Sequence, residues 1–589
     1  MPRALACLAL VCLLLCSACA PFNKVAQDYL RLPQDAAPTA VFAGAKVDPA
    51  AENWTFADIR FVMPDVDKLI RRADTLLARV QAGKNLEKQL KNFESLSRAY
   101  ESAYSMCAYA YIRYCQNMAE EIWQERYIEL SDQLNELNYR LVDIAVALIA
   151  AEQSGALTLP WSAARKQAFV REDGLNAPSV IEDMRQELKL VATYDKLGSG
   201  LTVSFEGRDW SYAQITEETQ LPYGEYAALC DLYDGEYAQR AAALFLELMA
   251  LRGGMAEKLG YESYTAYRYD CYRRDYTPED ITALCAAVKT HLVPLYRTYT
   301  VKFSNDLYYL YGASFSQAHS LARIQTAITQ TAPELAEAWG YMRQHELYDL
   351  NLDTGKLGGS YTIYLSDYHA PFLYSHWDDS ATIVGTVIHE FGHFANNYYN
   401  PRFGVNAGES LDLCEVDSQG FEMLMMGTYD TIFNRHAGAA QINELLDALY
   451  SVIAGCMEDE FQQRVYAAKD ITAAEMNRIY QELAAEYGLA ELYGIEGTSW
   501  THIPHHFRSP LYYISYAASM LAALQIWELA QQDRADATAA YLNILKREPY
   551  AAFRETLAKN GLGTPMRPES VAELAETLTN YFNIQELYG

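Results

Sequence analysis

The sequence is poor in basic residues. Its 589 residues include 47 Lys and Arg against 76 Asp and Glu, which gives a formal net charge of −29 at pH 7. Because such a chain would repel phosphates, we expect no nucleic-acid partner. Charged residues make up only 21% of the chain and apolar residues 51%, which argues against a disordered protein and leaves ample chain for a large buried core.

The cysteines lack the pattern of a disulfide framework. Four of the 11 Cys fall within the first twenty residues, and the other seven are scattered from Cys107 to Cys456 without paired spacing. We therefore expect most of these seven to be small, buried, apolar side chains. The sequence also has no evident internal repeat and no low-complexity tract.

A long apolar run occurs only at the N-terminus. Arg3 precedes the apolar residues 4–15 and then small residues, a pattern that is typical of a secretory signal and too short to span a membrane. Cleavage after Ala20 would place a proline directly behind the cut, which is unfavourable. The alternative is the lipobox-like segment LCSAC, with Cys19 as the lipidated first residue, although Cys16 stands where Leu is usual.

This N-terminal pattern predicts an exported protein. We expect a lipoprotein-type signal peptide at residues 1–18 and a tether rich in Ala and Pro at residues 19–50. A lipid on Cys19 would hold the protein on the outer face of the bacterial membrane, and without it the protein would be secreted or periplasmic. This anchor is the only membrane contact that we expect.

The rest of the chain has mainly helical periodicity. Apolar residues recur every three or four positions from about residue 63 to 190 and again from about 220 to 350. Two β-like stretches interrupt this pattern: TVSFEGRDWSYAQI, typical of a hairpin around Glu206-Gly207, and LDTGKLGGSYTIYLSDYHAPFLYSHW. A domain boundary near the first stretch would separate an N-terminal helical domain at 51–200 from a second domain at 201–589.

The sequence ATIVGTVIHEFGHFANNYYN, at 381–400, has the pattern of a metal site. The preceding residues 378–380, DDS, supply helix caps, and the apolar spacing predicts a helix. His389 and His393 are four residues apart, so both imidazoles project from one face, as suits one Zn²⁺. Glu390 is offset by about 100° along the helix. It can therefore reach a water on the metal instead of the metal, and act as a general base.

A catalytic zinc site needs a third protein ligand and one open position. The next acidic helix, GESLDLCEVDSQGFE, offers Glu409, Asp412, Glu415 and Glu422, which by charge alone all compete for this place. We expect the three that are not ligands to lie on a solvated helix face. Alternatively, Asp412, Asp417 or Glu422 could accept the outer N–H of a zinc-binding histidine and fix its tautomer.

These two motifs resemble those of the zinc oligopeptidases of the thimet oligopeptidase and bacterial oligoendopeptidase F family. That family has H-E-F/L-G-H, followed by a helix in which a Glu precedes a Ser-Gln step, with another Glu seven residues after the ligand. The resemblance implies that Glu415 is the third ligand and Glu422 a supporting carboxylate. Asp417 stands where the thimet-type enzymes have Pro, which favours the bacterial branch. LRGGMAEKLGYESYTAYRY and GKLGGSYTIYL are also similar to family segments, so the likeness covers roughly residues 200–525.

A third block, WTHIPHHFRSPLYYISYAASM, carries candidate groups for oxyanion stabilisation. We expect Ser509-Pro510 to begin a helix, on which Tyr512, Tyr513 and Tyr516 share a face. Neutral phenols can donate hydrogen bonds to the oxyanion that amide hydrolysis creates. With 46 Tyr in the chain, aromatic core packing is the alternative interpretation.

The family places a His and then a Tyr pair after its zinc ligands. The resemblance therefore implies catalytic roles for His506, Tyr513 and Tyr516 beside Glu390, although the neighbouring His505 could serve in place of His506. We expect His505 and Tyr512 to contact the substrate.

The second β-like stretch offers a place for a peptide substrate. An extended peptide can add as a strand to an exposed sheet edge, and its backbone then carries the hydrogen bonds. We expect the strand around residues 370–376 to receive the peptide, and Gly358 and Gly359 to let a loop approach the substrate backbone closely. An ordinary connecting hairpin is the alternative interpretation.

The motifs and the resemblance together predict a mostly α, two-lobed helical metallopeptidase with a deep central channel and a small β-sheet beside the zinc helix. The expected protein is a monomeric zinc-dependent oligoendopeptidase with one Zn²⁺ per chain, held by His389, His393 and Glu415 in the catalytic domain at 201–589. It would hydrolyse internal bonds of short unfolded peptides through a zinc-activated water, with Glu390 as general base. Two alternatives remain, a peptidyl-dipeptidase or carboxypeptidase of the angiotensin-converting-enzyme type and a non-catalytic peptide-binding lipoprotein.

Overall fold

The computed structural model describes residues 54–218, 220–400 and 410–588. The predicted signal peptide and tether, at 1–50, and the ligand candidate Glu409 lie outside the described residues. Over the described ranges no helix combines the length and the apolar character that crossing a membrane requires. The described chain is mostly helical, which confirms the predicted fold class.

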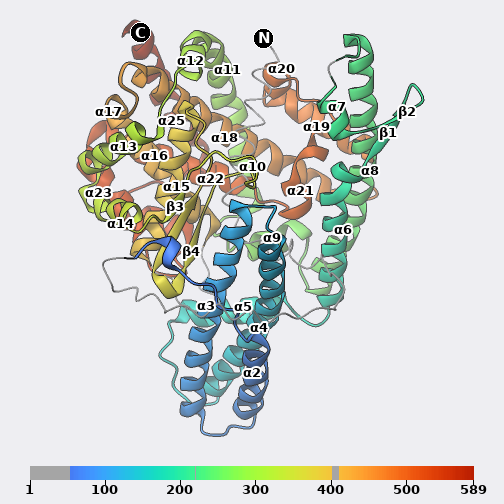
Figure 1. Ribbon diagram of the computed structural model, residues 1–589, viewed down its shortest axis with the longest axis vertical. Coiled ribbons are helices and arrows are strands. Elements are labelled where there is room, and N and C mark those ends of the chain that lie inside the picture. The colour runs from blue at the N-terminus through green and yellow to red at the C-terminus, as the bar shows by residue number, and fades with distance from the viewer. Residues whose placement is uncertain (1–53, 219, 401–409, 589) are drawn as a thin grey trace.

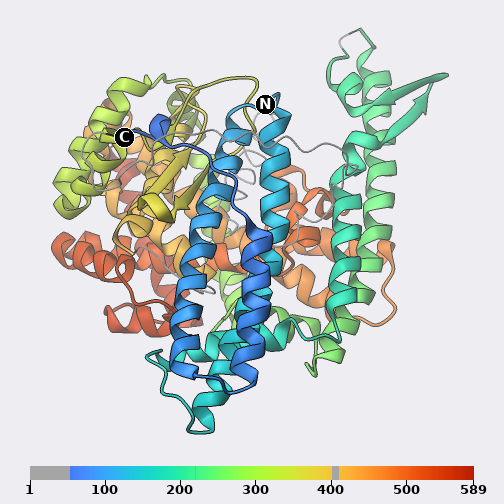
Figure 2. The ribbon, with the colours of Figure 1, turned by 60° about the horizontal axis from the view of Figure 1, so that its bottom comes forward.

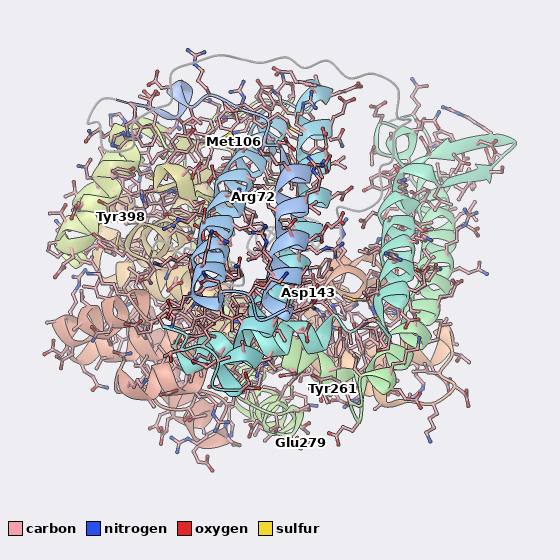
Figure 3. All side chains as sticks on the ribbon, turned by 90° about the horizontal axis from the view of Figure 1, so that it is seen from below. Arg72, Met106, Asp143, Tyr261, Glu279 and Tyr398 are labelled. Carbon is pink, nitrogen blue, oxygen red and sulfur yellow. The ribbon has the colours of Figure 1, made fainter. Side chains whose placement is uncertain are left out.

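The N-terminal part consists of helices whose colour runs from blue to teal in Figure 2. These are α2 (Val66–Gln81), α3 (Leu86–Gln116), α4 (Glu121–Gln153), α5 (Ala163–Leu175) and α6 (Ile181–Gly200). Helices α2, α3 and α4 pack against one another, and Figure 3 shows them from below, with Arg72, Met106 and Asp143 marking one helix each. Asp65 and Asn85 cap α2 and α3, because each side chain accepts a hydrogen bond from a backbone N–H of the first turn.

The first predicted hairpin is present and projects at the right edge of Figure 1. Strands β1 (Thr202–Phe205) and β2 (Arg208–Ser211) pair antiparallel. Glu206 and Gly207 make the turn with φ angles of 51° and 79°, the left-handed conformation that a tight two-residue hairpin requires. The hairpin is followed by α7 (Tyr212–Thr216) and by α8 (Tyr223–Lys258), which packs against α6.

The remaining helices form the rest of the molecule. They are α9 (Tyr264–Cys271), α10 (Pro278–Ala287), α11 (Val293–Lys302), α12 (Ser304–Tyr311), α13 (Gln317–Thr331), α14 (Ala336–Gln344), α15 (Ala381–Tyr399), α16 (Leu411–Met425), α17 (Tyr429–Phe433), α18 (Ala437–Ala467), α19 (Ala473–Glu486), α20 (Leu489–Tyr493), α21 (Pro504–Arg508), α22 (Ile514–Gln532), α23 (Arg534–Leu545), α24 (Phe553–Lys559) and α25 (Pro568–Tyr588). Helix α22 packs against both α16 and α18, and α16 packs against α15, so these four helices form the centre of the core. The seven cysteines in the described residues are all free, and four of them are buried.

The second β-like stretch forms a three-stranded sheet in the order β3-β5-β4. Strand β5 (Ala370–Tyr374) is the central strand, antiparallel to β4 (Tyr361–Leu365) and parallel to the short β3 (Tyr348–Asp349). All five residues of β5 are buried. The prediction that the strand around 370–376 receives a peptide is therefore wrong, because both its edges are occupied, and the edge strand beside it is β4.

Candidate metal centre

Helix α15 carries the two histidines of the predicted site. Ser380 begins this helix, because its Oγ accepts a hydrogen bond from the backbone N–H of Ile383 at 3.1 Å. The rings of His389 and His393 lie one turn apart, with centroids separated by 5.1 Å. Glu390 lies between them in sequence and is only 1% exposed. Because α15 packs against β4 and β5, the two imidazoles are held beside the small sheet.

Gly392 allows α16 to approach α15 closely. A Cβ built at Gly392 would lie 2.3 Å from the backbone oxygen of Asp417 and 2.6 Å from the Cα of Ser418, so any larger residue would push the two helices apart. Glu415 lies on α16 just before this crossing and is 1% exposed. The glycine of the HEFGH motif thus brings the Glu415 carboxyl beside the histidines.

The three predicted ligands converge. Glu415 Oε2 is 3.9 Å from the Nε2 atoms of both His389 and His393, and one ligand atom from each residue lies within 4.8 Å of the other two. This carboxylate oxygen is buried and has no hydrogen-bond partner among the described residues. A buried acceptor of this kind is costly unless something compensates it, and a cation between two imidazoles would do so. Two His and one Glu are also a common ligand set of catalytic zinc, so the residues fit this metal.

The charges in the cluster agree with a cation site. Burial raises the pKa of Glu415 to about 8, although His389 opposes the shift. Burial acts to lower the pKa of His389, but Glu422 and the other two carboxylates outweigh it and raise that pKa to about 9. Burial likewise raises the pKa of Glu390 to about 7. The carboxyl groups of Glu390, Glu415 and Glu422 therefore outnumber the positive charges that the protein places beside them.

Neighbouring side chains orient the proposed ligands. Glu422 Oε1 lies 3.1 Å from His389 Nδ1, so this carboxylate can accept the outer ring N–H and leave Nε2 as the ligand atom. Tyr512 donates its hydroxyl to Glu415 Oε1 at 3.2 Å. Thr362, on β4, donates its hydroxyl to Glu390 Oε2 at 2.9 Å and thereby holds the carboxylate of the proposed base. Sequence reasoning missed Thr362, because only the fold brings β4 beside α15.

The other acidic candidates of α16, Asp412 and Asp417, are not part of the His389, His393 and Glu415 cluster. Asp417 is 1% exposed and forms a two-bond ion pair with Arg547, with N–O distances of 2.6 and 3.0 Å. Asp412 is also 1% exposed, and burial raises its pKa while Arg274 lowers it. The expected solvated helix face is therefore wrong for Asp412, which belongs to a buried charge network.

The structure corrects the helix start predicted in the third block. Ser509-Pro510 do not begin a helix: the short α21 ends at Arg508, and α22 begins only at Ile514. Between them Leu511 adopts a left-handed backbone with φ 61°. The tyrosines still meet, with ring centroids 5.6 Å apart for Tyr513 and Tyr516.

The structure also separates the two adjacent histidines. His506 is fully buried, with Nε2 2.9 Å from Glu458 Oε2 and Nδ1 3.2 Å from the backbone oxygen of Trp500. His505 instead packs edge-on against Tyr513 at a centroid distance of 4.8 Å. Burial lowers the pKa of His505 to about 3, so this imidazole is neutral. The geometry therefore corrects the assignment of His506: His505 is the imidazole that accompanies the tyrosine pair.

Gly358 and Gly359 lie on the exposed loop before β4. Gly359 has φ 105°, and a Cβ at either glycine would meet no protein atom within 4 Å. These glycines are thus not forced by a close contact within the protein, and their predicted contact with substrate stays a prediction.

A cavity of about 180 Å³ opens at the ligand cluster. His389, Glu390, Glu415, Tyr513 and Tyr516 line it, together with residues of α12, α17 and α18. Sequence reasoning missed the α18 contribution, although Asn443, Glu444, Asp447 and Ser451 give this apolar helix a polar stripe at helical spacing.

The helical fold places a His, His and Glu cluster with the ligand set of a catalytic metal site at a cavity. Comparison with known proteins identifies the family. Residues 333–565 match peptidase family M3, and residues 56–152 match the peptidase M3 N-terminal domain, together more than half of the chain. The chain belongs to the peptidase M3 family, a metallopeptidase family that is generally zinc-dependent. The predicted metalloendopeptidase class is thereby confirmed.

Individual relatives agree with this family. The group B oligopeptidase PepB of Streptococcus agalactiae is 21% identical over 425 residues, which cover 63% of this chain and 68% of PepB. The plasmid oligoendopeptidase F of Lactococcus lactis subsp. cremoris is 22% identical over 324 residues, 51% of this chain and 53% of that protein. An X-ray structure assigned as an oligoendopeptidase F shares the fold with a TM-score of 0.75 at 23% identity, over 90% of this chain and 99% of that one.

Proposed function

We propose that the chain is a zinc-dependent oligoendopeptidase that hydrolyses internal bonds of short unfolded peptides. The observation that supports this most directly is the buried Oε2 of Glu415 at the wall of a cavity. This oxygen lies 3.9 Å from both histidine Nε2 atoms and has no hydrogen-bond partner in the described part of the chain. His389, His393 and Glu415 would hold one Zn²⁺. Bound there, zinc supplies an acidified water and a Lewis acid for the scissile carbonyl.

The side chains around the cavity can perform the proton transfers. Glu390 would accept a proton from the attacking water and pass it to the leaving amine, and Thr362 orients its carboxylate for this task. Tyr513 and Tyr516 line the same cavity and would donate hydrogen bonds to the developing oxyanion. Neutral His505, packed on Tyr513, would keep that phenol in place.

The edge strand β4 is the place for the peptide backbone. Its residue Thr362 contacts the proposed base, so a peptide added alongside β4 would bring a scissile bond close to Glu390. Such pairing uses backbone hydrogen bonds and depends little on substrate sequence. This assignment replaces the one made for the central strand β5.

The test is hydrolysis of an internally quenched fluorescent peptide that is acetylated and amidated at its ends. We expect cleavage that a chelator stops and zinc restores. Glu390→Gln should retain one equivalent of zinc and lose turnover, whereas the exposed Glu334→Gln should behave like the native protein. Turnover by Glu390→Gln would show that another group is the base. Product masses separate the two peptidase classes, because a dipeptide-releasing enzyme needs a free carboxyl terminus.

We also propose that the protein is exported, acts as a monomer and is anchored through a lipid on Cys19. The sequence pattern of residues 1–19 supports export and the anchor. Mass spectrometry of the mature N-terminus is the test: a diacylated Cys19 supports the anchor, and an N-terminus at another residue contradicts it.

A further inference from the structure

The wall of the cavity formed by α18 has a feature that the metal chemistry does not use. Glu444, Asp447 and Ser451 lie at successive turns of α18 and line the same cavity as the proposed metal ligands His389 and Glu415. We propose that this wall binds a cationic group of the peptide substrate, an ammonium or guanidinium near the scissile bond. The proposal rests on the function proposed above, because it places the substrate in the same cavity.

The charge of the cavity favours a cation. Five carboxyl groups line it, those of Glu390, Glu415, Glu422, Glu444 and Asp447. Among the lining residues in the described part of the chain, none is Lys or Arg. One divalent ion held by Glu415 would leave the carboxyl groups of α18 without a positive partner. A cation from the substrate would supply it.

The α18 carboxyl groups are held ready for such a partner. Tyr429 donates its hydroxyl to Glu444 Oε2 at 2.7 Å, and Asn443 donates its amide to Asp447 Oδ2 at 2.7 Å. These bonds fix both carboxyl groups on the cavity wall. Burial raises the pKa of Asp447 to about 7, and burial together with Glu422 raises that of Glu444, so an arriving cation would favour the ionised form of each.

Two further polar atoms, on residues that line the same cavity, lack a partner within residues 54–218, 220–400 and 410–588. Gln419 is only 3% exposed, and its Oε1 accepts no hydrogen bond from these residues. The hydroxyl of Ser451 is likewise buried without one. Both residues line the cavity, and Gln419 Oε1, which can only accept, favours a ligand that carries N–H donors. An ammonium offers three N–H donors and a guanidinium five, whereas an apolar side chain would leave all these groups unsatisfied.

The other walls suit the stem of a long basic side chain. Leu310, Phe433 and Ala440 line the cavity beside the carboxyl groups. Methylene groups of Lys or Arg would pack against them while the charged end reaches Glu444 and Asp447. The cavity therefore combines apolar contacts with two carboxyl groups that an arriving cation would ionise.

The experiment compares peptides that differ only in one charge. The protein is zinc-loaded Glu390→Gln, and the ligands are labelled peptides that are blocked at both ends. In each peptide, one residue that flanks the scissile bond is replaced by Arg, citrulline or norleucine. Fluorescence anisotropy gives the Kd of each peptide. At one position we expect Arg to bind about tenfold more tightly than citrulline. Asp447→Asn and Glu444→Gln, each in this background, should bring that ratio close to one. Asp430→Asn, an exposed change of equal charge on α17, should leave it unchanged.

Two control measurements and two single variants keep the outcomes distinct. Zinc content and circular dichroism confirm that each variant is folded and loaded, and the two single variants provide independent tests. A preference that appears only when the peptide has a free amino terminus identifies the ammonium as the ligand and also supports the proposal. Equal binding of Arg and citrulline peptides at every position, no binding of any of them, or a ratio that survives both variants overturns it. Binding selectivity without cleavage by the native enzyme would contradict the proposed peptidase activity alone.

Discussion

Glu422 acts on the proposed metal site through a single hydrogen bond. Its Oε1 lies 3.1 Å from His389 Nδ1 and is not one of the three converging ligand atoms. Loss of a carboxylate that orients a metal-binding histidine weakens metal affinity by about 10- to 100-fold. We therefore expect Glu422→Ala to bind zinc correspondingly more weakly, measured by competition with a chromogenic chelator. The exposed Asp430→Asn is the control, and equal affinities of the native and Glu422→Ala proteins would contradict this role.

The tyrosines that sequence reasoning could not separate have different positions. Tyr512 hydrogen-bonds Glu415, whereas Tyr513 and Tyr516 line the cavity. We expect Tyr512→Phe to reduce zinc affinity, and Tyr513→Phe and Tyr516→Phe to keep zinc but lower kcat by about 10²- to 10³-fold, because each removes a donor to the oxyanion. Zinc titration and steady-state kinetics on the three variants are the measurement. Full activity of both Tyr513→Phe and Tyr516→Phe would contradict the proposal that these phenols donate hydrogen bonds to the oxyanion.

The sequence does not distinguish the roles of adjacent candidate residues. The His389, Glu390 and His393 pattern was predicted from helical spacing alone, because all three lie on one helix. His505 and His506 could not be separated in that way, because they lie on a five-residue helix whose orientation depends on its contacts with Trp500 and Glu458.

At the scale of helices, the contact between α15 and α16 depends on Gly392. Its added Cβ would lie 2.3 Å from a backbone oxygen, which no side-chain movement can relieve. We expect Gly392→Ala to lower the free energy of unfolding by about 1–3 kcal/mol or more. Gly385→Ala on the same helix meets nothing within 4 Å and should be neutral or stabilising by up to about 1 kcal/mol. Thermal unfolding in the presence of a chelator measures both without a contribution from zinc, and equal melting temperatures would contradict the close contact.

The sequence predicted where helices and strands occur better than it predicted which of them pack or pair with one another. Periodicity predicted the helical stretches, the first hairpin and the β-like character of the second stretch, since these depend on local spacing and on turns such as Glu206-Gly207. The strand order β3-β5-β4 could not be inferred, because β3 is two residues long and pairs with a strand more than twenty residues away. The start of α22 was misplaced because proline is a common first helical residue. Here residues 509–513 instead form turns, with Leu511 in the left-handed conformation and its backbone oxygen bound by Arg274.

At the scale of the whole molecule, distant residues hold the segment that carries His505 and the tyrosines. Arg252, on α8, is fully buried and donates to the backbone oxygens of His506 and Phe507. Arg274 donates to the oxygen of Leu511 at 2.6 Å. These contacts span more than 230 residues of sequence, so no local pattern signals them. They explain why the site was predicted as separate motifs but not as one geometry.

Glu101 links the N-terminal helices to the small sheet and makes stability depend on pH. Its backbone oxygen accepts a hydrogen bond from Ser366, beside β4, and burial with repulsion from Asp367 raises its carboxyl pKa from 4.5 to about 7. Between these values the folded protein keeps a proton that the unfolded chain releases, so the free energy of unfolding falls as pH rises through this window. Glu101→Gln removes the linkage. We expect the fall between pH 5 and 7 to shrink by about 1 kcal/mol, a figure discounted for the solvent around this half-buried side chain. Denaturant unfolding across this range, with the exposed Glu125→Gln as control, is the measurement, and parallel pH profiles of the native and Glu101→Gln proteins would contradict the linkage.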